Sequence, residues 1–177
     1  KTVEQARAII ALGVEKIALS SGVLEDLSLI ASLASELGSQ SVVVVLDVKR
    51  DFLGRYKVFT HNGGQATGLD LLPLISKVQE YGAGEIVINS IDRDGMSEGY
   101  DFKLARTVKD QVFVPLTFLG GAGSLNDIEK LISENGIIGC AAGSLFVFKG
   151  IYRAVLISYP DQMRRQEMIK RTIEQFK

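Results

Sequence analysis

The sequence has no tryptophan, a single cysteine (Cys140) and a single histidine (His61) among its 177 residues. One cysteine excludes an internal disulfide and a cysteine-rich metal centre, and it fits a reducing, cytoplasmic setting. One histidine gives little support to zinc chemistry or to a Ser-His-Asp triad. We therefore expect no metal and no cofactor.

Neither sign of charge dominates, and no apolar run is long enough to cross a bilayer. Twenty basic residues are interspersed with twenty-one acidic ones, so the basic stripe of a nucleic-acid partner site is missing. A membrane association is not expected either. The sequence begins at Lys1 rather than Met, inside a helix-like segment, so we expect a fragment of a longer chain.

Five short apolar runs rich in β-branched residues predict strands that are covered on both faces, as in a parallel sheet. Segments with helical spacing of apolar residues separate the runs, and the repeat of about 25 to 30 residues is typical of βαβ units. The expected strands are 16–21, 41–47, 85–92, 114–121 and 137–144. The expected helices are 3–10, 27–37, 71–78 and 128–132, with a weaker candidate at 101–109.

Both a doubly wound open sheet and a closed barrel use such units. Residues 12–21 can be laid over residues 135–144 without a gap, and an offset of about half a (β/α)₈ chain favours the barrel. Residues 54–67 interrupt the rhythm with alternation followed by Asn62-Gly63, which predicts a β-hairpin. This hairpin is either a mobile lid or a decorated surface loop.

Small and hydroxyl residues follow the expected strands at one rim of the barrel. Glycines let a backbone approach a ligand, and amides at the start of a helix attract an anion, so we predict a phosphate site. The alternative is that small residues only permit tight turns. The strand ends carry Ser20 and Ser21, Gly95, Gly120 and Gly121, and Gly143 and Ser144.

Asp47 ends the apolar run 42–47 and is the predicted catalytic acid or base. A carboxylate at the tip of a buried strand is costly unless it is paired or functional, so the alternative is an ion pair with Lys49, Arg50 or another basic neighbour. Asp92 and Asp94 rank second, because their loop also reads as a hydrogen-bonded brace.

These motifs together resemble the cyclase (HisF-type) subunit of imidazole glycerol phosphate synthase. The resemblance runs over nearly the whole chain and rests on segments 45–50, 59–63, 82–86, 90–95, 99–101, 120–123 and 141–144. It implies an α/β fold, the (β/α)₈ TIM barrel, with this chain covering about strands 4 to 8 and their helices. Residues 1–177 then form a single barrel domain whose strands 1 to 3 are absent from the sequence.

The resemblance also implies a chemistry. The family's barrel receives ammonia from a glutaminase subunit docked on its N-terminal face, then cleaves and cyclises a phosphoribosyl-formimino carboxamide nucleotide in histidine biosynthesis. Asp47 matches one of two catalytic aspartates, and the other lies upstream of Lys1. Lys16 and Glu85 match members of the charged ring that gates the ammonia channel. Ser20 and Ser21 match one phosphate site, and Gly120, Gly121, Gly143 and Ser144 match the other.

Some positions depart from the histidine-pathway pattern. Leu119 replaces a serine, Asn89 a threonine and Ser20 an asparagine, while segments 54–56 and 148–156 resemble a paralogous branch. That branch is associated with acetamidino modification of surface-polysaccharide sugars. The alternative function is therefore an ammonia-relay subunit of that pathway. An isomerase of the sister histidine-pathway barrel fits the motifs less well. We expect the 177 residues alone to lack cyclase activity, and either to oligomerise or to need the missing residues for stability.

Overall fold

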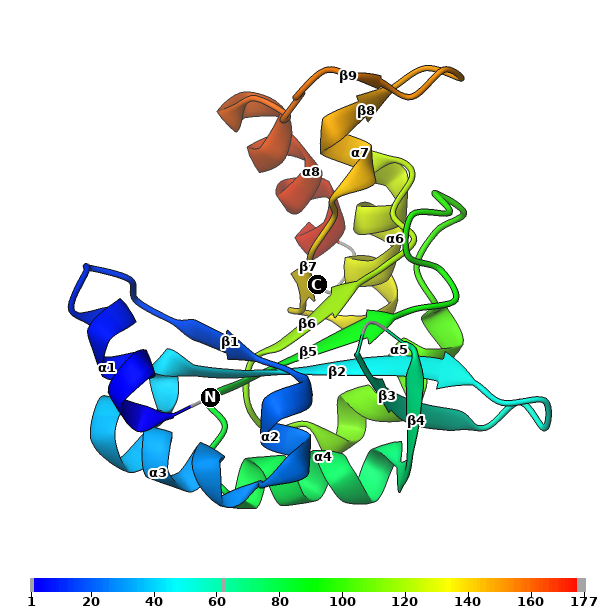
Figure 1. The fold of residues 1–177 in the computed structure, drawn as a ribbon. Coiled ribbons are helices and arrows are strands. Elements are labelled where there is room, and N and C mark those ends of the chain that lie inside the picture. Colours follow the sequence, from blue (N-terminus) through cyan, green and yellow to red (C-terminus); the bar gives the residue numbers. More distant parts are fainter. Residues whose placement is uncertain (1, 62, 175–177) are drawn as a thin grey trace.

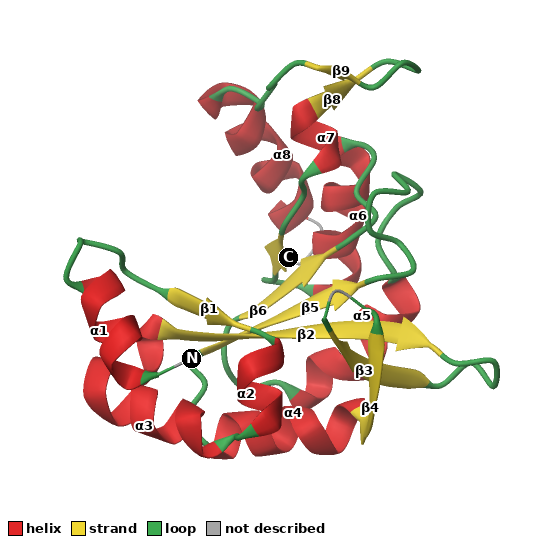
Figure 2. Ribbon diagram, in the orientation of Figure 1, coloured by secondary structure: helices red, strands yellow, loops and turns green. Residues whose placement is uncertain are grey.

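The computed structural model describes residues 2–61 and 63–174. A curved sheet forms its centre, and helices α3 and α4 run along one side of that sheet (Figures 1 and 2). The helices are α1 (Val3–Ile10), α2 (Ser21–Glu25), α3 (Ser28–Leu37), α4 (Leu71–Glu80), α5 (Phe102–Val108), α6 (Leu125–Asn135), α7 (Ser144–Val147) and α8 (Gln162–Glu174). Two short 3-10 helices occupy Ser39–Ser41 and Lys109–Gln111. No helix in this described part is long and apolar enough to span a bilayer.

Five parallel strands follow one another across the sheet in the order in which they occur along the chain. They are β1 (Ile17–Leu19), β2 (Val42–Arg50), β5 (Glu85–Ser90), β6 (Leu116–Leu119) and β7 (Gly139–Cys140). A doubly wound sheet reverses its strand order at a switch point, whereas a barrel wall never does. The unreversed strand order therefore identifies these five strands as the wall of a (β/α)₈ barrel and confirms the predicted fold class. Within the described residues this wall is open, with β1 and β7 at its ends.

Successive side chains along each strand point to opposite faces of the wall. On β2, Val42, Val44 and Leu46 are fully buried, and on β5 Ile86 and Ile88 are fully buried as well. These residues form the helix face. The intervening residues, such as Val45 and Asp47, point to the opposite side, which we call the lumen face. Paired residues of neighbouring parallel strands share a face, so the strand register assigns every lumen position.

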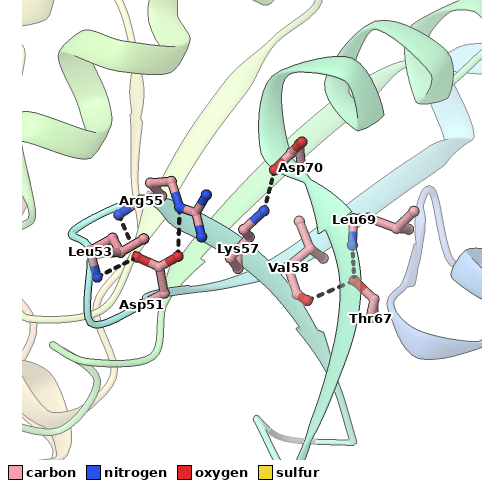
Figure 3. Close-up of polar contacts among 8 residues, drawn as sticks. All are labelled: Asp51, Leu53, Arg55, Lys57, Val58, Thr67, Leu69 and Asp70. Atoms are coloured by element: carbon pink, nitrogen blue, oxygen red, sulfur yellow. Dashed lines mark hydrogen bonds and ion pairs between the residues drawn. The ribbon is translucent and has the colours of Figure 1, made fainter.

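The predicted hairpin is confirmed as β3 (Tyr56–Thr60) and β4 (Gln65–Asp70), although Asn62 of its turn lies outside the described residues. Strand β2 continues beyond the wall and pairs antiparallel with β3 from Asp47 to Arg50. Polar contacts within residues 51–70 hold the β3–β4 hairpin and the turn before it together, as Figure 3 shows. Asp51 accepts hydrogen bonds from both the backbone and the side chain of Arg55, and Lys57 forms an ion pair with Asp70.

A second, unpredicted hairpin consists of β8 (Phe148–Lys149) and β9 (Ala154–Val155). It follows α7 directly and lies beyond α7 and α8, away from the main sheet (Figure 1). Two backbone hydrogen bonds tie its return strand to α7: Leu156 N–H donates to Val147 O at 2.8 Å, and Ser158 N–H donates to Phe146 O at 2.8 Å.

Candidate functional site

Asp47 lies on the lumen face, 8% exposed, with hydrogen bonds to two neighbouring strands. Its Oδ1 accepts a hydrogen bond from Asn89 Nδ2 at 2.8 Å, and its Oδ2 accepts one from Ser20 Oγ at 3.4 Å. No ion pair to Asp47 occurs among the described residues, so the alternative pairing with Lys49 or Arg50 is wrong for this structure. Both hydrogen-bond donors to the carboxylate are therefore neutral groups.

Asn89 stands directly beside Asp47 because the two residues are register partners on β5 and β2. A carboxylate only accepts hydrogen bonds, so the amide must turn its Nδ2 toward Asp47 and its Oδ1 away. That Oδ1 is buried and has no partner within the described chain. An unpaired buried acceptor costs stability, and a ligand N–H would relieve the cost.

A small pocket lies at the carboxyl ends of β5, β6 and β7, and we call it the rim pocket. It brings together five of the predicted phosphate-binding residues from three separate loops. Its lining consists of Asp94, Gly95, Ser97, Leu119, Gly120, Gly121, Ala122, Ala142, Gly143 and Ser144.

Two of the rim-pocket glycines are required by packing. Gly120 and Gly121 have φ of 99° and 104°, and a Cβ on Gly121 would lie 2.2 Å from the backbone oxygen of Gly99. The turn interpretation therefore accounts for this pair. It does not account for Gly143, whose φ is −104° and whose hypothetical Cβ meets nothing within 4 Å.

Free backbone donors surround the rim pocket. In the described part of the chain the N–H groups of Gly121, Gly143 and Ser144 donate no hydrogen bond. The start of α6 is different, because Asp127 Oδ2 accepts from the N–H groups of both Gly123 (3.0 Å) and Ser124 (2.8 Å). These amides at the start of α6 are thus already capped, whereas the N–H groups of Gly121, Gly143 and Ser144 are not.

Ser20 and Ser21 lie apart from this pocket, on the far side of β2. Ser20 contacts Asp47, as described above. Ser21 Oγ accepts a hydrogen bond from the backbone N–H of His61 at 2.9 Å, and the His61 side chain is exposed. Ser21 therefore holds the tip of the β3–β4 hairpin against the wall.

Lys16 and Glu85 pair with each other at the amino end of the wall. Lys16 Nζ lies 2.7 Å from Glu85 Oε2, and Thr117 Oγ1 donates to Glu85 Oε1 at 3.0 Å. Analysis of the sequence missed Thr117, although it shares the lumen face with Leu119 two residues later. The three side chains form one polar layer across β1, β5 and β6.

Three polar residues that were not among the predicted site residues, Tyr56, Tyr100 and Asp101, connect elements at the rim. Tyr56 O–H donates to Asp101 Oδ1 at 3.0 Å, and Asp101 also accepts from Leu104 N–H at the start of α5. Burial first, and then the Asp101 charge, raise the pKa of Tyr56 to about 12. Tyr100 O–H donates to Ala141 O at 2.8 Å, which joins two of the rim-pocket loops.

Asp92 also braces the rim, because its Oδ2 accepts from Arg50 N–H at 2.9 Å, whereas Asp94 lines the rim pocket. Among the described residues no cluster of three or more His, Cys, Asp or Glu could hold a metal ion.

Comparison with known proteins identifies the family of this chain. The sequence profile of a family described as "Histidine biosynthesis protein" matches residues 1–152. The chain belongs to this family. The match covers all five wall strands and confirms the resemblance stated from the motifs.

Relatives within the histidine biosynthesis family are similar over most of this chain. A protein of Leptospira interrogans, provisionally named imidazole glycerol phosphate synthase subunit HisF, is 50% identical over 169 residues, which is 95% of this chain and 66% of the relative. A provisionally named subunit hisF3 of Vibrio vulnificus (strain YJ016) is 48% identical over 171 residues, 96% of this chain and 66% of the relative. The HisF subunit of Alkaliphilus metalliredigens (strain QYMF) is 37% identical over 151 residues, 85% of this chain and 60% of the relative. This chain thus spans just under two thirds of the length of such relatives.

Proposed function

We propose that this protein is a cyclase subunit of the imidazole glycerol phosphate synthase type, with residues 1–177 contributing to one barrel domain. The proposal rests above all on Asp47, a carboxyl side chain on the lumen face whose two hydrogen-bond donors, Ser20 and Asn89, are both neutral. Such a group can accept a proton from a substrate and return it. Ser20 and Asn89 orient the carboxylate, so both of its oxygens keep fixed directions.

The rim pocket is the proposed site for one phosphate of the substrate. Backbone N–H groups without partners at Gly121, Gly143 and Ser144 supply donors, and glycine turns let the anion approach them closely. Ser20 and Ser21 are the proposed contacts for a second phosphate, on the opposite side of Asp47. A substrate with a phosphate at each end would then lie across the carboxylate.

Ammonia is the proposed second substrate, supplied by a glutaminase partner at the amino end of the wall. The polar layer of Lys16, Glu85 and Thr117 stands at that end, and Val43, Val45 and Val87 line the lumen face between it and Asp47. An apolar passage suits neutral ammonia better than ammonium, because desolvating a charge is costly.

Exposed apolar side chains at the same end support the partner. Leu12, Phe113 and Ile137 precede β1, β6 and β7, and their exposed fractions are 83%, 86% and 103%. Parallel strands place all three at the amino end of the wall. Large apolar groups gathered at one end of a protein mark an interaction surface.

The test is turnover of the phosphoribosyl-formimino carboxamide nucleotide by the full-length protein with saturating ammonium salt and no glutaminase. We expect imidazole glycerol phosphate to form, and Asp47→Asn to lower kcat by about 10²- to 10⁴-fold. Lys49→Ala is the matched control, because Lys49 is a neighbouring exposed residue on β2. Unchanged turnover in Asp47→Asn would exclude the acid/base role.

The second candidate is an ammonia-relay subunit for acetamidino modification of surface-polysaccharide sugars. It is favoured by the departures from the histidine-pathway pattern at Ser20, Asn89 and Leu119. If folded, phosphate-binding protein gives no turnover of the nucleotide, this second function replaces the first.

A further inference from the structure

Both the segment that leads into the β8–β9 hairpin and the turn of the hairpin contact residues of the rim pocket. Gly143 and Ser144 line the pocket and lead through α7 into β8, whereas Arg153 stands at the far turn of the hairpin. Arg153 Nη1 donates a hydrogen bond to the backbone oxygen of Gly95 at 3.3 Å, and Gly95 is another lining residue of the pocket. A segment that extends away from the wall thus places one cation at the pocket's edge.

Three restraints hold Arg153 in that position. Its backbone has φ of 49°, a left-handed conformation that is costly for a residue other than glycine and is often found at functional sites. Its guanidinium carbon lies 4.8 Å from the ring centroid of Phe148 across the hairpin. The hydrogen bond to Gly95 fixes one edge of the guanidinium, and its other N–H groups remain available.

No carboxylate neutralises this cation within the described chain. Arg7, Arg55, Arg106 and Arg171 each form an ion pair with an acidic side chain, whereas Arg153 forms none. A guanidinium presents five N–H donors in a planar fork that matches a phosphate group. Asp94 also lines the pocket and would repel an anion, and a positive charge at the pocket's edge would offset that repulsion.

We propose that Arg153 binds the substrate's phosphate in the rim pocket, and that the β8–β9 hairpin is therefore a specificity element of the site. The inference rests on the proposed function, since it needs the rim pocket to take a phosphate. It adds a residue from outside the barrel wall to the donors that the glycine turns supply. Phe148 is a positioning residue, because it acts only through the guanidinium.

The experiment is titration calorimetry of inorganic phosphate into full-length protein as wild type and as Arg153→Ala, Arg153→Lys and Phe148→Leu. We expect Arg153→Ala to weaken phosphate binding about tenfold, which corresponds to about 1.4 kcal/mol. Arg153→Lys keeps the positive charge but loses the planar guanidinium, so its phosphate affinity should lie between that of wild type and that of Arg153→Ala. Phe148→Leu should weaken binding by less than Arg153→Ala does.

Arg164→Ala is the matched control, because Arg164 is an exposed α8 arginine whose side chain forms no hydrogen bond or ion pair with the described residues. Equal phosphate affinity in wild type and Arg153→Ala would overturn the role of Arg153 while leaving the pocket intact. An equal loss in Arg164→Ala would also overturn it, since the effect would then be one of overall charge. Absence of phosphate binding by folded wild type would overturn the pocket itself.

Discussion

Replacing Gly121 or Gly143 by alanine separates the packing role of the rim glycines from their binding role. A methyl group on Gly121 would lie 2.2 Å from Gly99 O, and the φ of 104° is unfavourable for alanine. The left-handed backbone costs about 1–2 kcal/mol. Overpacking against a rigid carbonyl costs about 1–3 kcal/mol more. We therefore expect Gly121→Ala to lower the free energy of unfolding by about 2–5 kcal/mol.

Gly143→Ala is the opposite case, because its backbone is compatible with alanine and no atom lies within 4 Å of the new Cβ. We expect its free energy of unfolding to change by no more than about 0.5 kcal/mol. Gly143 nevertheless lines the rim pocket, so we expect a methyl group at this position to weaken phosphate binding. We thus expect Gly121 to serve folding and Gly143 to serve the proposed phosphate site.

The assay is urea unfolding of the full-length variants, together with phosphate titration. With a urea dependence of about 2 kcal/mol/M, Gly121→Ala should lower the unfolding midpoint by about 1–2.5 M. The reasoning is refuted if Gly121→Ala unfolds at the wild-type midpoint. It is equally refuted if Gly143→Ala keeps its stability and binds phosphate as well as wild type does.

Two further predictions concern titration. The pKa of Tyr56 is about 12 in the folded protein against 10.0 for an unperturbed tyrosine, so its contribution to stability should be complete below about pH 10 and lost as the pH rises through 12. Tyrosinate absorbance of wild type minus Tyr56→Phe measures this pKa, which Asp101→Asn should lower. Burial raises the pKa of Cys140 to about 12, so iodoacetamide should alkylate the native thiol far more slowly than the urea-unfolded one. Equal alkylation rates in both states would contradict the burial of Cys140.

The parallel wall was accessible from sequence because short apolar runs rich in β-branched residues alternate with segments of helical spacing. Residues 137–144 were expected as a full strand, yet β7 covers only Gly139–Cys140, since strand length depends on partners that a local pattern does not contain. The β8–β9 hairpin escaped prediction because two-residue strands have no period. Helix α8 also escaped it, since few apolar residues mark its buried side.

In the site as well, local sequence patterns mark single residues, whereas contacts between distant residues depend on the fold. Asp47 was identifiable because a carboxylate ending an apolar run is unusual, whereas the Asp47–Asn89 contact depends on the register between two strands. The hydrogen bond from Tyr56 to Asp101 joins residues 45 positions apart, and no local signal marks either partner. Arg153 could not be placed before the second hairpin was known.

The alternation of helix-face and lumen-face residues has a consequence for how such a protein diverges. Three departures from the histidine-pathway pattern, Ser20, Asn89 and Leu119, all lie on the lumen face: Ser20 and Asn89 contact Asp47, and Leu119 is the register partner of Asn89. The helix-face neighbours Ile88 and Phe118 remain packed beneath the helices. Selection can therefore change ligand preference at every second residue while the intervening residues maintain the scaffold. A gene duplicate can acquire a new substrate in this way long before its fold drifts.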